Sequence, residues 1–195
     1  MNNQNFLIRA FIAISIPEHI KKSVSDLQKQ LQQSGINASW QKPDTMHVTL
    51  KFFGNIGVPQ IDSIKSCMIR AVTGIPAYSL SFSGIGAFPS VKNTRVLWSG
   101  TRGQTDVLEK LANRLDKLLF ENAGILKENR IFSSHLTLAR IKHPLDPKKM
   151  INLLQAFHGF CSQDFLVSEI DFFQSELKSS GAVHKIIFSA RLDSD

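Results

Sequence analysis

The sequence predicts an α+β fold: a bilobal, pseudo-twofold molecule in which two mostly antiparallel sheets face a central cleft and helices cover the outer faces. Two observations support this prediction. Helix-like and strand-like segments do not alternate one for one along the 195 residues, as a doubly wound parallel sheet would require. The order of segments also repeats, because each half contains helix, strand with His-x-Thr, helix, strand, strand. We therefore expect a single bilobal domain over residues 1–195.

Composition excludes several classes of protein. Hydrophobic residues make up 43% and charged residues 20%, which is too apolar for a disordered chain. The two cysteines, Cys67 and Cys161, support neither a disulfide framework nor a cysteine-based zinc site, and they suit a reducing, cytoplasmic location. The net charge of +7 attracts phosphate-bearing partners, although it is equally compatible with simple solubility.

The first half begins with an apolar run over Phe6–Ile16, which Arg9 interrupts. This run is too short to span a membrane and too poor in basic residues at its start for a signal peptide, so a buried strand is predicted. Apolar residues at helical spacing predict a helix over 18–34, with Gly35 as its C-cap. The remaining segments are a strand over His47–Phe53, a helix over 60–73, and strands over Tyr78–Phe88 and Arg95–Thr101.

The second half repeats this order. A leucine-rich stripe predicts a helix over 105–122 that ends at Gly124, and a strand follows over Phe132–Ile141. Pro147 suits the first turn of a helix that continues to Phe157. Two more strands are predicted over Asp164–Phe173 and Val183–Arg191, with a polar loop over 174–181 between them.

Two strands carry the same short motif, His47-Val48-Thr49-Leu50 and His135-Leu136-Thr137-Leu138. Side chains alternate faces along a strand, so the histidine and threonine share one face while the apolar residues anchor the other. If the repeat forms a pseudo-twofold, the two polar faces meet across the cleft. Two imidazoles and two hydroxyls then surround one small volume.

Such an arrangement suits phosphodiester cleavage by general acid–base catalysis. One imidazole takes a proton from the attacking water, and the other, protonated, gives a proton to the leaving oxygen. A histidine pKa near 6.5 allows both states at neutral pH. The hydroxyls of Thr49 and Thr137 can donate hydrogen bonds to phosphate oxygens.

Other interpretations find less support. A single His-x-Thr in a strand is common, and only the matched pair gives the motif weight. His19, His143, His158 and His184 lack this setting, and we expect them to be surface or structural residues. No metal site is predicted, because there is no H-E-x-x-H and threonine is a poor zinc ligand. Phosphate-cradling glycine motifs are also absent, so no cofactor is expected.

Five ordered segments resemble the two-histidine (2H) phosphoesterase superfamily, and within it the RNA 2′,3′-cyclic phosphodiesterase (LigT-like or ThpR) family. They are Arg9–Ala13 with Pro17, His47–Gly54, Phe88-Pro89 with Arg95–Trp98, His135–Arg140, and Ser175–Leu177 with Gly181. The resemblance implies a metal-independent, cytoplasmic hydrolase that opens a terminal 2′,3′-cyclic phosphate of RNA to a 2′-phosphate. Some members also act as 2′–5′ RNA ligases. It implies no membrane association and no obligate protein partner.

The resemblance also implies individual roles. His47 is the expected proton donor and His135 the expected acceptor, although the residue types alone leave the assignment open. Phe52 is expected to stack on a nucleobase and Arg140 to bind phosphate, with core packing and a surface ion pair as the alternatives. Each follows its histidine by five positions, which places it on the opposite strand face unless a bulge, strong twist or strand end follows Leu50 and Leu138.

One position departs from the family, because His184 stands where a tyrosine is usual. Basic residues also gather near the second motif and could guide an RNA backbone, or simply form a solvated face: Lys127, Arg130, Arg140, Lys142, Lys148 and Lys149. Two alternative functions remain. One is a 2H enzyme acting on another cyclic nucleotide or a 2′–5′ linkage, and the other is a non-catalytic protein that binds RNA ends.

Overall fold

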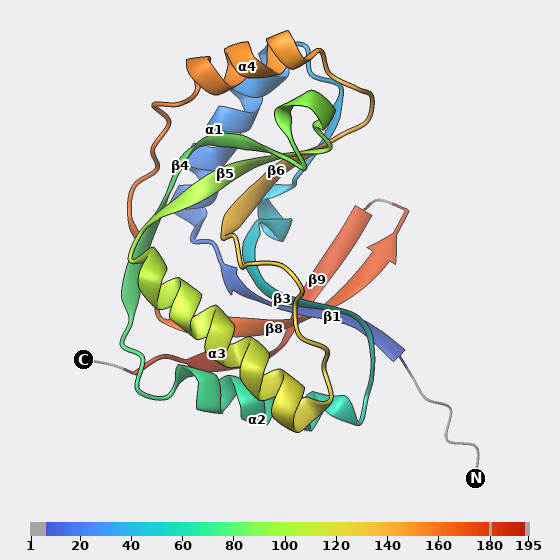
Figure 1. Ribbon diagram of the computed structural model, residues 1–195, viewed down its shortest axis with the longest axis vertical. Helices are drawn as coiled ribbons and strands as arrows, with labels where there is room; N and C mark the ends of the chain where they lie inside the picture. Colours follow the sequence, from blue (N-terminus) through green and yellow to red (C-terminus); the bar gives the residue numbers. More distant parts are fainter. Residues whose placement is uncertain (1–6, 180, 194–195) are drawn as a thin grey trace.

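The computed structural model describes residues 7–179 and 181–193 and confirms the α+β class (Figure 1). The strands are β1 (Leu7–Ser15), β2 (Ala38–Trp40), β3 (His47–Gly57), β4 (Tyr78–Phe88), β5 (Val96–Gly103), β6 (His135–Ile141), β7 (Phe165–Val167), β8 (Glu169–Lys178) and β9 (Gly181–Arg191). The helices are α1 (Glu18–Gln33), α2 (Gln60–Val72), α3 (Thr105–Ala123) and α4 (Pro147–Ala156), with short 3₁₀ turns at Pro43–Thr45 and Val91–Asn93.

The two expected sheets are the halves of one curled sheet. The strand order is β7-β4-β5-β6-β3-β1-β8-β9, with β2 paired to β6, and every pairing between these strands is antiparallel. Among the described residues, the two halves of the sheet join only where Val48 of β3 pairs with Leu136 of β6. These residues directly follow the two motif histidines, so the junction of the lobes lies within the two His-x-Thr strands.

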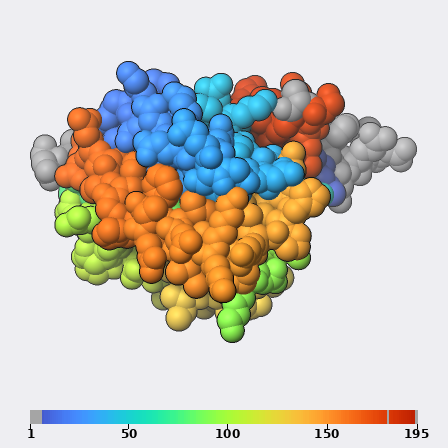
Figure 2. Space-filling model, turned by 90° about the horizontal axis from the view of Figure 1, so that it is seen from above, coloured from blue at the N-terminus to red at the C-terminus, as the bar shows by residue number. Residues whose placement is uncertain are grey.

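Each lobe combines strands from both halves of the sequence. The lobe of β3, β1, β8 and β9 is covered by α2 and α3, which pack on each other, while α1 and α4 lie with β4, β5 and β6 (Figure 1). Figure 2 shows α1 and the α4 region side by side on one face, although they are far apart in the sequence. Because the lobes exchange strands, neither half of the chain can form a lobe alone.

The helices follow the local rules that the sequence suggested. The buried residues of α1 include Ile20, Val24, Leu27 and Leu31, one stripe of a 3.6-residue period. Gly124 ends α3 in the left-handed conformation, with φ of 64°. At α4, Pro147 occupies the first turn and the Asp146 carboxylate accepts a hydrogen bond from the Lys148 backbone at 2.9 Å. None of the helices in the described ranges has the length and apolarity needed to span a bilayer.

The C-terminal strands differ most from the prediction. The single strand predicted over 164–173 is two, β7 and β8, and β8 continues through the polar segment predicted as a loop. That prediction was wrong because backbone pairing with β9, including Ser175 opposite His184, stabilises a strand whose side chains are polar. Phe6 and Ser180 lie outside the described residues.

Gly86 in β4 makes room for an aromatic stack that reaches His135. A Cβ at Gly86 would lie 2.2 Å from the Trp98 ring, Trp98 stacks on Phe88 at 5.0 Å, and Phe88 contacts the His135 ring edge-on at 4.9 Å. Replacement Gly86→Ala should therefore displace Trp98 and destabilise the fold by roughly 1–3 kcal/mol, as overpacking does. Urea unfolding measures this change, with Gly159→Ala as the control because no atom lies within 4 Å of its added Cβ. Equal stability of the two variants would contradict the steric argument.

Candidate active site

A cavity of about 280 Å³ lies at the junction of the two lobes. It brings together all six residues that the sequence singled out: His47, Thr49, Phe52, His135, Thr137 and Arg140. The pairing of Val48 with Leu136 explains this convergence. Counted outward from that antiparallel pair, His47 comes opposite Thr137 and Thr49 opposite His135.

The two histidines are held in the same way. The Nδ1 atom of His47 lies 2.8 Å from the Thr45 carbonyl, and that of His135 lies 2.7 Å from the Ser133 carbonyl. A carbonyl oxygen can only accept, so each Nδ1 carries the proton and donates it. In the neutral ring this leaves Nε2 unprotonated and available for proton transfer.

The structure contains the bulges that the site requires. In β3, Lys51 pairs with Ile12 and Thr49 with Ala13, so Leu50 is left unpaired. In β6, Ala139 pairs with Leu97 and Thr137 with Trp98, so Leu138 is unpaired in the same way. Each extra residue reverses the alternation of side chains and returns the fifth residue to the histidine face.

Phe52 and Arg140 accordingly reach the cavity. The Phe52 side chain is 47% exposed, which argues against core packing, and the Arg9 guanidinium lies 4.9 Å from the centre of its ring. Arg140 is exposed, and within the described ranges it forms no ion pair. Both side chains are thus available to a ligand.

His184 is the site residue that the sequence missed. It lines the cavity, and its ring contacts the His47 ring edge-on with 5.5 Å between centroids. Its Nδ1 is buried and has no hydrogen-bond partner among the residues that the structure describes. His184 therefore lies beside the two motif histidines, which the sequence did not predict, although its place in the usual tyrosine position was a signal that could have found it.

The surroundings of His47 keep it neutral. Its ring stacks on Phe11 at 4.6 Å, and burial lowers its pKa from 6.5 to about 4, with repulsion from the His184 imidazole as the next contribution. Burial, together with the charge of Arg9, also lowers the pKa of His184. His47 and His184 are therefore uncharged in the unliganded protein at neutral pH.

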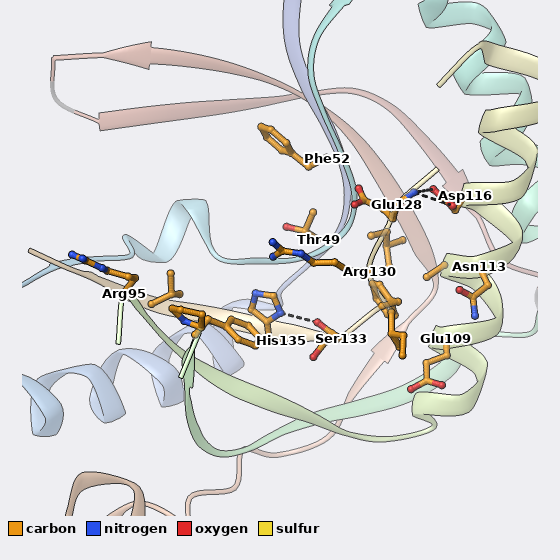
Figure 3. Close-up of a pocket in the computed structure, with 17 residues that line it drawn as sticks. Thr49, Phe52, Arg95, Glu109, Asn113, Asp116, Glu128, Arg130, Ser133 and His135 are labelled. Atoms are coloured by element: carbon orange, nitrogen blue, oxygen red, sulfur yellow. Dashed lines mark hydrogen bonds between the residues drawn. The ribbon is translucent and has the colours of Figure 1, made fainter. Parts of the chain in front are cut away.

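A second cavity of about 890 Å³ adjoins the first and shares Thr49, Phe52 and His135 with it (Figure 3). One wall is the segment 124–134 between α3 and β6. The buried Lys51 ammonium secures this segment, because it contacts the Asp116 carboxylate at 2.6 Å and donates to the Leu126 carbonyl at 2.7 Å. Lys51 faces the interior because it follows the unpaired Leu50.

The side chains offer no cluster of metal ligands. In the part of the chain that the structure describes, no group of three or more histidine, cysteine, aspartate or glutamate side chains could hold a metal ion.

Comparison with known proteins connects this geometry to a family. The family model for LigT-like phosphoesterases matches residues 14–98 and again residues 101–184. The chain belongs to this family, which is part of the 2H phosphoesterases. Its two matched segments support the internal repeat, and His47 and His135 fall at nearly equivalent distances from their starts.

Relatives of this LigT-like protein are similar over most of their length. An RNA 2′,3′-cyclic phosphodiesterase of Thermotoga maritima is 30% identical over 95% of this chain and 96% of its own. One of Methanothermobacter thermautotrophicus is 29% identical over 91% and 95%. Two solved structures share the fold. TT0787 of Thermus thermophilus has a TM-score of 0.78 and 21% identity, with 96% of this chain and 100% of that chain covered. E. coli LigT complexed with 3′-AMP has a TM-score of 0.76 and 22% identity, with 96% of this chain and 99% of that chain covered.

The depressed pKa of His47 predicts how stability depends on pH. Between about pH 6.5 and 4 the unfolded chain holds a proton on this ring and the folded LigT-like protein does not, so stability is lost as the pH falls through that window. The loss attributable to His47 should reach about 3 kcal/mol, at 1.36 kcal/mol per pKa unit. Urea unfolding at several pH values tests this against His47→Gln, whose stability should fall less. Parallel curves for the two proteins would contradict the prediction.

Proposed function

We propose that this LigT-like protein is an RNA 2′,3′-cyclic phosphodiesterase that converts a terminal 2′,3′-cyclic phosphate to a 2′-phosphate. The observation that carries the proposal is the pair of histidines in matching frames, each donating from Nδ1 to the carbonyl two residues before it. Both line a single cavity of a size that suits a phosphate and its ribose. The names of the relatives support the same activity.

The proposed reaction is a hydrolysis that needs two proton transfers. Nε2 of His135 takes a proton from a water molecule as the water oxygen attacks phosphorus. Protonated His47 gives a proton to the ribose 3′ oxygen as the bond between that oxygen and phosphorus breaks. The products are a 2′-phosphate and a 3′-hydroxyl. The substrate anion supports the donor role, because a negative charge beside His47 favours its protonated form.

The remaining cavity residues bind rather than react. The hydroxyls of Thr49 and Thr137 can donate to the non-bridging phosphate oxygens, and the Arg140 guanidinium can pair with their negative charge. Phe52 offers an exposed ring on which the terminal base can stack. Its exposure is the observation that favours RNA over a substrate without a base.

Other parts of the proposal concern the setting of the activity. The continuous sheet through both lobes supports a single domain over residues 1–195. Both cysteines are free, which suits the cytoplasm. The in-class alternative, another cyclic nucleotide or a 2′–5′ linkage, uses the same residues. Two intact histidines argue against a protein that only binds RNA ends.

Single replacements test the two histidines and their assignment together. His47→Ala and His135→Ala should each slow opening of a cyclic-phosphate oligonucleotide by ~10²–10⁴-fold. A substrate with sulfur in place of the leaving 3′ oxygen needs no proton donor, so it should restore most of the rate to His47→Ala and little to His135→Ala. Rescue of His135→Ala alone would reverse the assignment. Near-wild-type rates in either folded variant would refute the mechanism.

The dependence of kcat/KM on pH and metal is a separate test. Two unperturbed histidines would place both limbs of a bell-shaped profile near neutrality, whereas the lowered pKa of His47 moves the acid limb toward pH 4. Activity should survive dialysis against EDTA, because the proposed proton transfers need no metal. Loss of turnover on chelation, with recovery on adding zinc, would show instead that a metal-bound water is the nucleophile.

A further inference from the structure

The larger of the two cavities has no role in the reaction proposed above. At about 890 Å³ it is within the range of ligand-binding pockets, and it opens beside the phosphate site through Thr49, Phe52 and His135. With the cyclic phosphate at the histidines and the terminal base on Phe52, as proposed above, the next group along an RNA chain is a second nucleotide, and the larger cavity offers room for it. This continuity identifies the ligand class as an oligonucleotide.

Uncovered apolar side chains line the cavity. Ile131 is 96% exposed although it belongs to the lining, and Phe52 stands at the boundary between the two cavities with 47% of its surface exposed. Apolar surface left open in this way marks a binding site when it lies inside a concavity. A planar nucleobase, which needs apolar contact on its faces and little else, fits such a surface.

The charges in the cavity favour a phosphate. Arg95 and Arg130 line it, and in the described ranges neither is part of an ion pair. Figure 3 shows the Arg130 guanidinium directed toward Thr49 and His135, at the passage between the cavities.

Three carboxylates also line the cavity, Glu109, Asp116 and Glu128, and with Lys51 beside them the positive and negative charges are equal in number, so their positions matter. Asp116 and Glu128 lie 2.6 and 3.6 Å from the Lys51 ammonium. Glu109 lies on α3, away from Arg130 (Figure 3). The Arg130 guanidinium is therefore the charged group directed toward the passage, where a bridging phosphate would pass.

We propose that the larger cavity binds the nucleotide that precedes the cyclic-phosphate end, with its base against Ile131 and the bridging phosphate at Arg130. This inference rests on the proposed function and specifies its substrate as an oligonucleotide at least two nucleotides long. The segment 124–134 thus selects for chain length. Lys51 acts as a positioning residue, because it ties this segment to the strand that carries His47.

Two substrates of different length test the proposal. A dinucleotide ending in a 2′,3′-cyclic phosphate should be opened with a kcat/KM at least about tenfold higher than that of the corresponding mononucleotide, which one stacked base can supply. Arg130→Gln and Ile131→Ser should each lower kcat/KM for the dinucleotide by about tenfold and leave the mononucleotide within about twofold of wild type. Lys127→Gln is the matched control, because Lys127 lies on the same segment but contacts the Phe120 ring and does not line the cavity.

The other outcomes separate this inference from the proposed function. Equal loss on both substrates would place Arg130 at the terminal phosphate, and equal wild-type kcat/KM for both lengths would leave the cavity without a nucleotide; either result overturns the inference. Calorimetric binding of a dinucleotide and a mononucleotide that end in a 2′-phosphate gives a readout without turnover. If wild type opens neither substrate but binds the dinucleotide more tightly, with Arg130→Gln abolishing the difference, the proposed function is wrong and the cavity assignment stands.

Discussion

A regular strand cannot present a histidine and the residue five positions later on the same face, because its side chains alternate. The site depends on breaking this rule twice, at Leu50 in β3 and at Leu138 in β6. Each unpaired leucine remains buried, so the interruption costs ladder hydrogen bonds but little apolar burial. It places Phe52 and Arg140 beside the histidines of their own strands.

The same interruption organises the second cavity. Because Leu50 and Lys51 are both buried, the Lys51 ammonium is directed into the interior on the side away from the histidines. A buried cation requires partners, and it finds the Asp116 carboxylate and the Leu126 carbonyl. The wall of the larger cavity is thereby tied to the strand that carries His47, and a local irregularity of one strand affects the lining of both cavities.

Local patterns in the sequence were sufficient for much of the fold. Helices with a clear apolar stripe, such as α1, were predicted to within a residue or two, since the stripe and the flanking glycine or proline are local signals. The paired motifs likewise predicted that His47, Thr49, His135 and Thr137 come together, whereas Phe52 and Arg140 were added by the resemblance to the family. Strands with polar side chains, such as residues 174–178 of β8, were missed because their pairing depends on a partner that the segment itself does not reveal.

The exchange of strands between the lobes and the position of His184 both depend on pairing between strands that are far apart in the sequence. β8 follows β7 in sequence, yet it pairs with β1, and β9 pairs with β8, which carries His184 across to His47. Nothing within a few residues of His184 indicates that neighbour. Only its departure from the usual tyrosine gave a hint, and the resemblance, not periodicity, supplied it.

The two histidines share a backbone frame but not an environment, and burial lowers the pKa of His47 to about 4. His47 is stacked on Phe11 and faces a further imidazole from β9, whereas His135 meets the edge of Phe88 and lies between the two cavities. A pseudo-twofold scaffold alone would give two imidazoles in equal surroundings. β8 and β9 extend the sheet on one side only, and they break the symmetry at the site itself because they bring the His184 ring against His47 and leave His135 without such a neighbour among the ring contacts of the described residues.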